Sequence, residues 1–220
     1  MKIVKVDASN PDEKIIERAV KLLQKGEVIV CPTDTGYAFS ANALDIRAVT
    51  KVFQLKGRSF SNPVHMAVRS IEEAENYAEV NEPARYTAGH YLPGALTIVL
   101  KKKEIVPSLL VAGLDTVGIR IPDNKIILRL VEMVGKPLTT TSANISGKPA
   151  PYAVEEIVAQ LGEGIENIAL ILDQGPLARR DLSTIIDLSV SPPELIRQGR
   201  LSWLDIREVL NRLYKPKEPT

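Results

Sequence analysis

Hydrophobic positions along the chain follow helical and strand spacings in alternation. Apolar residues recur at helical spacing between residues 15 and 23, directly after the sequence Asn10-Pro11-Asp12-Glu13. This pattern predicts a helix with Asn10 as its N-cap and Pro11 at its first position, closed at Gly26. The continuous apolar run at residues 28–31 then predicts a fully buried strand.

The same two spacings divide the rest of the chain. Further helices are expected at residues 45–55, 70–77, 82–91, 124–134, 154–161 and from 203 onward. Strands are expected at residues 64–68, 96–100, 118–121, 137–141, 168–172, 183–187 and 194–197. Strands interleaved with helices favour an α/β fold around one twisted sheet, mixed rather than wholly parallel. We expect a single domain at residues 1–200, to which residues 201–220 add a C-terminal helix and a frayed tail.

Two polar loops leave the ends of predicted strands. Residues 139–149 contain many hydroxyl groups, one amide and one glycine, with a proline at either side, and residues 32–37 follow the buried strand in the same way. In open α/β sheets, ligand crevices form outside such strand ends. Residues 139–149 are therefore the stretch around which we expect a binding site.

Composition narrows the classes of partner and compartment. The 220 residues are 45% hydrophobic and 25% charged, and the formal net charge is +1. Such a chain can bury a sizeable core, and its whole-chain charge indicates neither a nucleic-acid nor a membrane partner. The single cysteine, Cys31, cannot form an intramolecular disulfide, and the sequence has no signal pattern or long apolar span. These features predict a soluble, cytoplasmic protein.

Several common catalytic motifs are absent from the sequence. It contains neither G-x-x-x-x-G-K-[ST] nor G-x-G-x-x-G, so neither usual glycine cradle for nucleotides is available. No cysteine, histidine and carboxylate group has the spacing of a metal site, and we expect none. Ser142-Ala143-Asn144 is similar to the S-D-N element of penicillin-binding proteins, but the S-x-x-K and K-T-G companions are missing.

Four cations remain with no acidic partner evident nearby in sequence: Lys56, Arg58, Arg120 and Arg197. Arginine binds carboxylates and phosphates bidentately, and each charged contact is worth about 1.5–3 kcal/mol. Gathered in one crevice, these cations would hold a highly anionic ligand. The alternatives are that Lys56 and Arg58 complement a helix C-terminus, and that Arg120 and Arg197 pair with surface acids. The spacing alone does not separate these interpretations.

Five separated motifs resemble the YrdC/Sua5 family of threonylcarbamoyl-AMP synthases. They are Pro32-Thr33-Asp34-Thr35, Lys56-Gly57-Arg58 with Asn62-Pro63, Pro93-Gly94-Ala95-Leu96-Thr97, Ser142-Ala143-Asn144-x-Ser146-Gly147, and Ser183-Thr184-Ile185. The resemblance runs in order from the first helix to about Arg197. It is to the short single-domain form, without the extra C-terminal domain of longer Sua5 proteins.

The resemblance implies a twisted α/β sheet with a deep, positively charged cleft and a defined reaction. L-threonine, bicarbonate and ATP would give L-threonylcarbamoyl-AMP and pyrophosphate, for the threonylcarbamoyl adenosine of tRNA. Downstream transfer proteins would accept the product, and Mg²⁺ would be held mainly through the phosphates. The family's cleft is also associated with double-stranded RNA.

Site residues follow from the resemblance position by position. Those that match its nucleotide-binding positions are Lys56, Arg58, Asn62, Thr116, Ser142, Asn144 and Arg197, with Lys56 and Arg58 expected to carry the catalysis. Those that match its threonine-binding positions are Thr35, Arg120, Thr140 and Ser183, with Arg120 the natural partner of the carboxylate. Ala67 stands where the family has a histidine. His65, two residues earlier on the same strand face, is the candidate in its place, or else an ordinary strand histidine.

Departures from the family pattern keep two alternatives open. Thr35 to Ser40 reads Thr-Gly-Tyr-Ala-Phe-Ser instead of Thr-Val-Tyr-Gly-Leu-Gly, a variant that occurs in the YciO-like branch. Ala150 replaces a serine, and Arg179-Arg180-Asp181 stands where glycine and glutamate are favoured. A YciO-like paralogue with other chemistry is one alternative, although such sequences tend to lose the Lys-Arg-Ser-Asn set kept here. A double-stranded-RNA-binding module is the other, although few aromatic residues accompany the cations.

Overall fold

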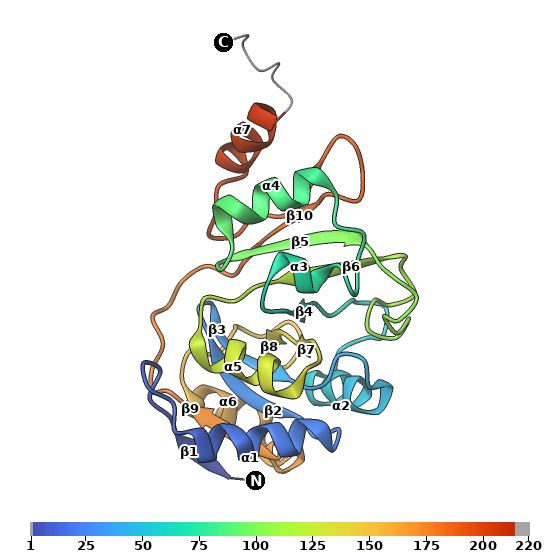
Figure 1. The fold of residues 1–220 in the computed structure, drawn as a ribbon. Coiled ribbons are helices and arrows are strands. Elements are labelled where there is room, and N and C mark those ends of the chain that lie inside the picture. Colours follow the sequence, from blue (N-terminus) through green and yellow to red (C-terminus); the bar gives the residue numbers. More distant parts are fainter. Residues whose placement is uncertain (1, 214–220) are drawn as a thin grey trace.

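Two mixed β-sheets lie one above the other in the computed structural model, which describes residues 2–213 (Figure 1). The five-stranded sheet contains, in spatial order, β1 (Ile3–Lys5), β9 (Leu170–Asp173), β2 (Ile29–Thr33), β3 (Gly36–Ser40) and β8 (Thr141–Ser142). The six-stranded sheet contains β11 (Glu194–Arg197), β10 (Thr184–Asp187), β5 (Leu96–Lys101), β6 (Thr116–Arg120), β4 (Met66–Ala67) and β7 (Leu138–Thr139). The mixed α/β class is confirmed, but the strands form two sheets where one was expected.

The helices begin and end close to the positions that the sequence predicts. They are α1 (Glu13–Gln24), α2 (Ile46–Lys56), α3 (Ile71–Ala74), α4 (Glu82–Tyr91), α5 (Lys125–Val134), α6 (Val154–Leu161) and α7 (Trp203–Leu213), with a 3₁₀ helix at Gly162–Asn167. Asp45 caps the start of α2, and Gly57 ends it in the left-handed conformation at φ 53°. Glycine adopts this conformation without the steric cost of a Cβ atom.

Helices cover both faces of the five-stranded sheet. In β2, Ile29 and Cys31 pack in a cluster that includes α1 and α5, whereas Val30 packs in a cluster that includes α2 and α6. All five residues of β2 are buried. This arrangement explains why the strand reads as a continuous apolar run rather than an alternating one.

Strand β5 of the six-stranded sheet packs one face in a helix-covered cluster, whereas at the edge of this sheet Ala67 of β4 and Leu138 of β7 pack with α1 and α5. Leu96, Ile98 and Leu100 of β5 belong to a core cluster that also contains residues of α4 and α7. Those two helices lie on the side of the sheet that faces away from the five-stranded sheet (Figure 1). The opposite face is turned toward the other sheet and carries polar residues such as Thr97.

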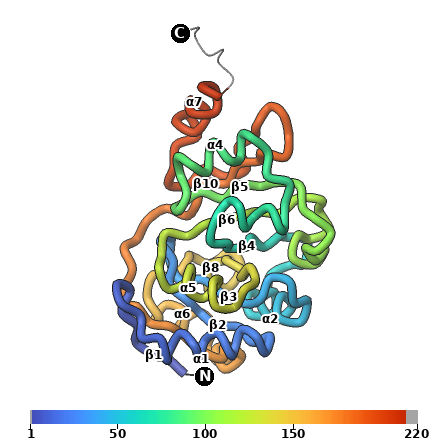
Figure 2. Tube along the Cα trace, viewed as in Figure 1, coloured from blue at the N-terminus to red at the C-terminus, as the bar shows by residue number. Residues whose placement is uncertain are grey.

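The chain crosses between the two sheets within residues 138–142. Leu138–Thr139 pairs with β4 in the six-stranded sheet, and Thr141–Ser142 pairs with β3 in the five-stranded sheet. Thr140, between them, donates its main-chain N–H to the carbonyl oxygen of His65 at 2.9 Å. The polar loop singled out in the sequence is thus the junction of the sheets. A second crossing, residues 174–183, runs up one side of the molecule between β9 and β10 (Figure 2).

Some local expectations are wrong. Helix α1 is capped by Asp12, whose side chain accepts from the N–H of Lys14 at 2.8 Å, and not by Asn10. Residues 36–40, expected as part of a loop, form β3 in a tight hairpin with β2. Strand β1 was not expected, and α3 ends at Ala74 rather than at residue 77. The expected frayed tail, residues 215–220, lies outside the described residues.

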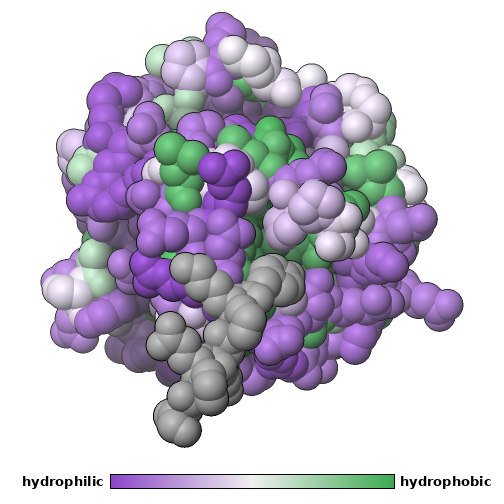
Figure 3. Space-filling model, turned by 90° about the horizontal axis from the view of Figure 1, so that it is seen from above, coloured by the Kyte–Doolittle hydropathy of each residue, from purple (hydrophilic) through white to green (hydrophobic). Residues whose placement is uncertain are grey.

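None of the helices within residues 2–213 is both long and apolar enough to span a bilayer. The end of the molecule that carries α7 is mainly hydrophilic, with smaller hydrophobic patches (Figure 3).

Candidate active site

A cavity of about 260 Å³, which we call the junction cavity, lies where the two sheets meet. The turn between β2 and β3, the crossing at residue 140 and the ends of β6, β10 and β11 all reach it. Its lining includes these residues expected from the sequence: Thr35, Arg58, His65, Arg120, Thr140, Ser142, Ser183 and Arg197. Segments far apart in the chain therefore supply one polar cavity with three arginines.

Arg120, at the end of β6, binds across to the other sheet. Its Nη2 donates to Asp34 Oδ1 and its Nη1 to Thr35 Oγ1, each at 2.7 Å, and its Nε donates to the carbonyl oxygen of Gly94 at 3.4 Å. The side chains of Arg120 and Asp34 are only 7% and 8% exposed, so their ion pair is buried. A guanidinium has five N–H groups, so two remain for a ligand. Arg120 does pair with an acid, but with one inside the site rather than on the surface.

Arg197 and Ser183 form a second polar group on the opposite side of the cavity. Arg197 donates from Nη2 to the carbonyl oxygen of Ser183 at 2.8 Å, and the hydroxyls of Ser183 and Thr97 are 3.0 Å apart. No acidic side chain among the described residues pairs with Arg197. The other alternative, a surface ion pair for Arg197, is thus wrong.

Lys56 ties the loop after β8 to the end of α2. Its Nζ donates to the carbonyl oxygens of Ser142 and Asn144 and to Asn144 Oδ1, the last at 2.9 Å. Its main-chain oxygen accepts from the N–H of Ser146 at 2.7 Å. The loop in turn fixes Asn144, whose Oδ1 also accepts from the Ser142 hydroxyl at 2.5 Å. Lys56 and Asn144 thus lie directly beside the junction cavity and position Ser142, which lines it.

Arg58 is held by the chain that follows it. Its Nε donates to the carbonyl oxygen of Asn62 at 3.1 Å and its Nη2 to that of Pro63 at 2.9 Å. No acidic group binds it within residues 2–213. Asn62 therefore orients Arg58 through its main chain, while its own side chain is not part of the cavity lining.

The cations of the site are short of counter-charge. Burial lowers the pKa of Arg58 and of Arg197, and burial followed by the charge of Arg58 lowers the pKa of Lys56 to about 7. Asp34 is the one acidic residue bound to this group of cations in the described part of the chain. An anionic ligand would supply the missing negative charge. The excess of positive charge is the strongest chemical property of the cavity.

His65 lies in the cavity wall as a neutral ring. Burial and then the charges of Arg197, Arg58 and Arg120 lower its pKa to about 3. Gly118 of β6 makes room for it, since a Cβ atom on Gly118 would lie 2.4 Å from His65 Cδ2. His65 can therefore donate or accept hydrogen bonds at neutral pH, but it adds no positive charge.

Thr116 does not line the cavity. It begins β6, the strand that Arg120 ends, and shares a strand face with Gly118 and Arg120 because side chains alternate with a period of two. A ligand that contacts both Thr116 and Arg120 would therefore have to extend along this face of β6, beyond the junction cavity.

Sequence reasoning missed two residues of the site. Asp34 holds Arg120, and Thr97 holds the hydroxyl of Ser183. Asp34 stands in the motif Pro32-Thr33-Asp34-Thr35 and Thr97 in Pro93-Gly94-Ala95-Leu96-Thr97, so these motifs were the available signal. Their partners are 86 residues away in each case, and the spacing along the chain could not reveal the contacts.

No group of three or more histidine, cysteine, aspartate or glutamate side chains gathers to hold a metal ion within residues 2–213. The single cysteine, Cys31, is buried, and burial raises its pKa to about 12. It contacts the hydroxyl of Ser40 at 2.6 Å. This thiol is therefore an inert part of the core.

Comparison with known proteins gives relatives that match most of this chain, some of which are considerably longer. The Sua5/YciO/YrdC family model, described as telomere recombination, matches residues 21–199. The chain is 41% identical over 200 residues to a putative threonylcarbamoyl-AMP synthase of Methanocaldococcus jannaschii, over 90% of this chain and 93% of the relative. It is 38% identical over 203 residues to the threonylcarbamoyl-AMP synthase of Pyrococcus abyssi, over 92% of this chain but only 59% of that relative.

Solved structures agree with these relatives. The Sua5 protein of P. abyssi complexed with L-threonine superposes with a TM-score of 0.89 at 38% identity, over 95% of this chain and 61% of that one. YciO of E. coli superposes with a TM-score of 0.81 at 30% identity, over 90% of this chain and 95% of that one. The matched family model, the identities and the shared fold lead to one conclusion. The chain belongs to the Sua5/YciO/YrdC family.

Proposed function

We propose that this chain makes L-threonylcarbamoyl-AMP and pyrophosphate from L-threonine, bicarbonate and ATP, as a nucleotidyltransferase. The observation that carries the proposal is the junction cavity, in which Arg58, Arg120 and Arg197 converge with one acid among them. Such a cavity suits a small carboxylate next to a polyphosphate. The names of the relatives from P. abyssi and M. jannaschii support the same activity.

Threonine would bind on the Arg120 side of the junction cavity. The two free N–H groups of Arg120 would take its carboxylate, and the hydroxyls of Thr35, Thr140 and Ser183 would surround the rest. Because Asp34 and Thr35 already fix the guanidinium, little conformational entropy is lost when threonine binds.

His65 would position threonine rather than remove its proton. The threonine amine must be un-ionised before it attacks bicarbonate-derived carbon. A ring with a pKa of about 3 is a weak base at neutral pH, because an efficient general base has a pKa near the working pH. Hydrogen bonding from the neutral ring is the role that its environment permits.

ATP would bind with its phosphates on the Arg58 and Arg197 side. The threonine amine and bicarbonate would first give the carbamate and water. A carbamate oxygen would then attack the α-phosphorus, the bond from this phosphorus to the α,β-bridging oxygen would break, and pyrophosphate would leave with that oxygen. Arg58, Arg197 and the Ser142 hydroxyl would stabilise the developing charge, with Lys56 and Asn144 holding Ser142 in place. Asn62 and Thr116 would act at the edges of the nucleotide, which extends beyond a cavity of about 260 Å³.

Magnesium would accompany ATP in this scheme. Mg²⁺ keeps several waters and binds through substrate phosphates, so it needs no cage of carboxylates from the protein. The hydroxyl of Ser142 is an oxygen ligand of a suitable kind beside the proposed phosphates. When bound, the ion would neutralise part of the phosphate charge.

The product is an activated mixed anhydride, so another protein must transfer its threonylcarbamoyl group onward. We propose tRNA as the final acceptor and the cytoplasm as the compartment, in keeping with the family resemblance.

A YciO-like paralogue of other chemistry is the second candidate, because the E. coli YciO structure matches nearly the whole chain. Double-stranded RNA binding is the weaker candidate, because the formal net charge is only +1.

One assay separates these candidates. Purified protein is incubated with ATP, Mg²⁺ and bicarbonate, with and without L-threonine, and pyrophosphate is measured while the carbamoyl adenylate is sought by mass. We expect pyrophosphate release to depend on threonine and the adduct mass to appear. Threonine-independent hydrolysis, or no turnover with threonine present, would contradict the synthase proposal. Serine and valine serve as control amino acids that each lack part of the threonine side chain.

A further inference from the structure

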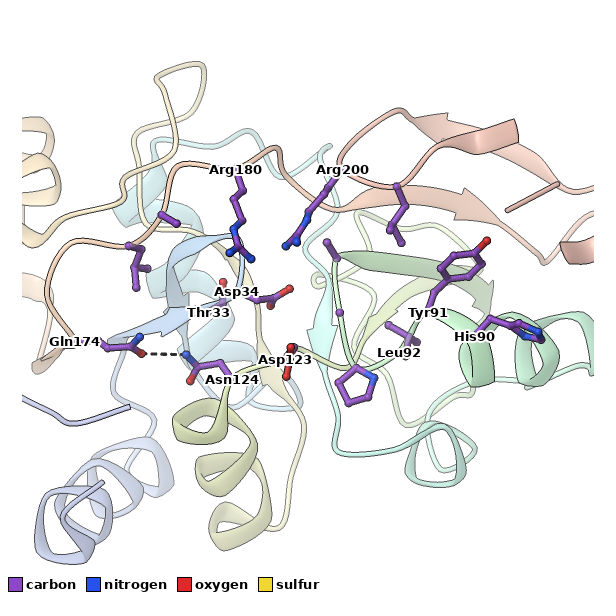
Figure 4. A pocket seen from close by; sticks show the side chains of 16 residues that line it. Thr33, Asp34, His90, Tyr91, Leu92, Asp123, Asn124, Gln174, Arg180 and Arg200 are labelled. Atoms are coloured by element: carbon purple, nitrogen blue, oxygen red, sulfur yellow. Dashed lines mark hydrogen bonds between the residues drawn. The ribbon is translucent and has the colours of Figure 1, made fainter. Parts of the chain in front are cut away.

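A second pocket, of about 510 Å³, lies beside the junction cavity (Figure 4). We call it the outer pocket. Thr33 lines both spaces, Asp34 lines the outer pocket, and Arg120 lines the junction cavity. The buried Asp34–Arg120 ion pair therefore lies between the two. The proposed reaction uses no residue of the outer pocket other than Asp34.

Two arginines from different segments point toward one another at the outer pocket. Figure 4 shows Arg180, on the crossing between β9 and β10, and Arg200, after β11, with their guanidinium groups directed into the same space above Asp34. Within residues 2–213, the side chain of neither arginine forms an ion pair or a hydrogen bond. Asp34, which also lines this pocket, pairs with Arg120 through Oδ1 and forms no ion pair with either arginine.

The fold holds the backbones of both arginines close together. The main-chain N–H of Arg200 donates to the carbonyl oxygen of Leu182 at 2.9 Å, and the hydroxyl of Tyr152 donates to the carbonyl oxygen of Arg180. The segments approach so closely at Gly199 that a Cβ atom there would lie 2.2 Å from the Leu182 oxygen. These contacts hold the two segments together without involving the side chain of either arginine.

Both guanidinium groups face the same pocket without an acidic partner among the described residues, and a dianion between them would pair with both. A phosphate group carries about two charges and three acceptor oxygens that match the guanidinium geometry. We propose that the outer pocket binds a phosphomonoester, with its phosphate between Arg180 and Arg200.

The rest of the outer pocket indicates what carries the phosphate. Its volume greatly exceeds that of a phosphate group alone. Asp123 lines it, and the amides of Asn124 and Gln174 bind one another at 3.1 Å across it. The Asp123 carboxylate as acceptor and the Gln174 amide N–H groups as donors suit the hydroxyl groups of a sugar, and Leu92 and Leu177 supply apolar contacts. A sugar phosphate or nucleoside monophosphate has the required combination.

The test measures binding of ribose 5-phosphate, AMP and inorganic phosphate by calorimetry. The background is the Arg58→Ala variant, in which the proposed ATP site is weakened, so that occupancy of the junction cavity does not obscure the result. We expect ribose 5-phosphate to bind, and Arg180→Ala or Arg200→Ala to weaken it about ten-fold or more. If AMP binds more tightly than ribose 5-phosphate, the pocket also contacts the base and its ligand is a nucleoside monophosphate. If the two bind equally, the pocket contacts only the sugar phosphate.

Arg179→Ala is the matched control. It removes the same charge one residue away, but Arg179 pairs with Glu156 and packs over the Tyr152 ring, outside the outer pocket. Binding of ribose 5-phosphate weakened as much by Arg179→Ala as by Arg180→Ala, or absent in the Arg58→Ala background, would overturn the proposal. Because the readout is binding and not turnover, failure here leaves the proposed synthase activity untouched.

Discussion

The two sheets use their faces differently. The five-stranded sheet is packed with helices on both faces, and the residues of β2 are all buried. The six-stranded sheet packs one face against α4 and α7 and turns the other, with Thr97, Gly118 and Arg120, toward the junction cavity. Polar chemistry is therefore concentrated where helices are missing. Substitutions on that face should change activity more than stability, and substitutions in the five-stranded sheet should do the reverse.

The largest difference between the effect on activity and the effect on stability is expected for Arg58→Ala. In the proposed reaction, removing this cation would leave transition-state charge on the phosphates unpaired, a loss that typically costs about 10²–10³-fold in rate. Because Arg58 binds only main-chain oxygens of its own loop, the free energy of unfolding should change little. Threonine-dependent pyrophosphate release and urea unfolding measure the two effects. Arg47→Ala, an exposed arginine of α2, is the control for charge alone.

Arg120→Ala should act mainly on threonine. The loss of a charged contact of about 1.5–3 kcal/mol predicts a rise in the KM for threonine of roughly 10- to 150-fold, with a smaller change in kcat. The variant also leaves Asp34 buried without its partner, so Asp34→Asn is measured beside it. Asp34→Asn keeps an oxygen acceptor for Arg120 and should raise KM less. A rise in the KM for ATP instead of threonine would assign Arg120 to the nucleotide.

Ile171→Val tests the expectation that substitutions in the five-stranded sheet change stability rather than activity. Ile171 is fully buried in the five-stranded sheet, and removing one methyl group typically costs about 0.5–1.5 kcal/mol of stability. The KM for threonine should stay the same. Thr97→Val, matched in shape on the six-stranded sheet, removes the hydroxyl that binds Ser183 and should raise that KM. If Ile171→Val raised the KM for threonine and Thr97→Val lowered only the stability, the proposed difference between the two sheets would be wrong.

The sequence predicted the elements well because each carries local signals. Helix α2, for example, has Asp45 at its start and Gly57 at its end. It did not predict two sheets, because Leu138–Thr139 and Thr141–Ser142 are two-residue strands whose partners lie far away in the chain. Strand β3 was missed because Gly36 follows a polar turn, and the apolar stretch after it is too short to be distinguished from a loop.

The site residues themselves came from the family resemblance, and the structure adds how they are held. Lys56 was expected at the phosphates, whereas its ammonium donates to three oxygens of the loop at 142–144. Asp34 became visible only through its contact with Arg120. Such roles depend on contacts between segments about 86 to 88 residues apart, which no local pattern encodes.

The smallest and most specific effect that we expect is a proton uptake by Lys56 when ATP binds. Burial, followed by the charge of Arg58, lowers its pKa to about 7, so above that pH the free protein holds it mostly as a neutral amine, which has two N–H groups for its three oxygen partners. Phosphate charge bound nearby favours the ammonium form and must raise this pKa. ATP binding at pH 8 should therefore take up a proton, approaching one per site. At pH 6, where the amine is already charged, Lys56 should contribute almost no uptake.

Calorimetry in two buffers of different ionisation enthalpy measures this uptake directly. The Lys56→Met variant removes the titrating group and should abolish the uptake at pH 8 while retaining the arginine contacts to the phosphates. Since Lys56→Met could also disturb the loop at 142–144, the pH dependence in the unaltered protein is the independent check. Proton release on ATP binding at pH 8, or uptake that does not decline toward pH 6, would place the phosphates away from Lys56. The anionic end of the ligand would then lie on the Arg120 side of the junction cavity instead.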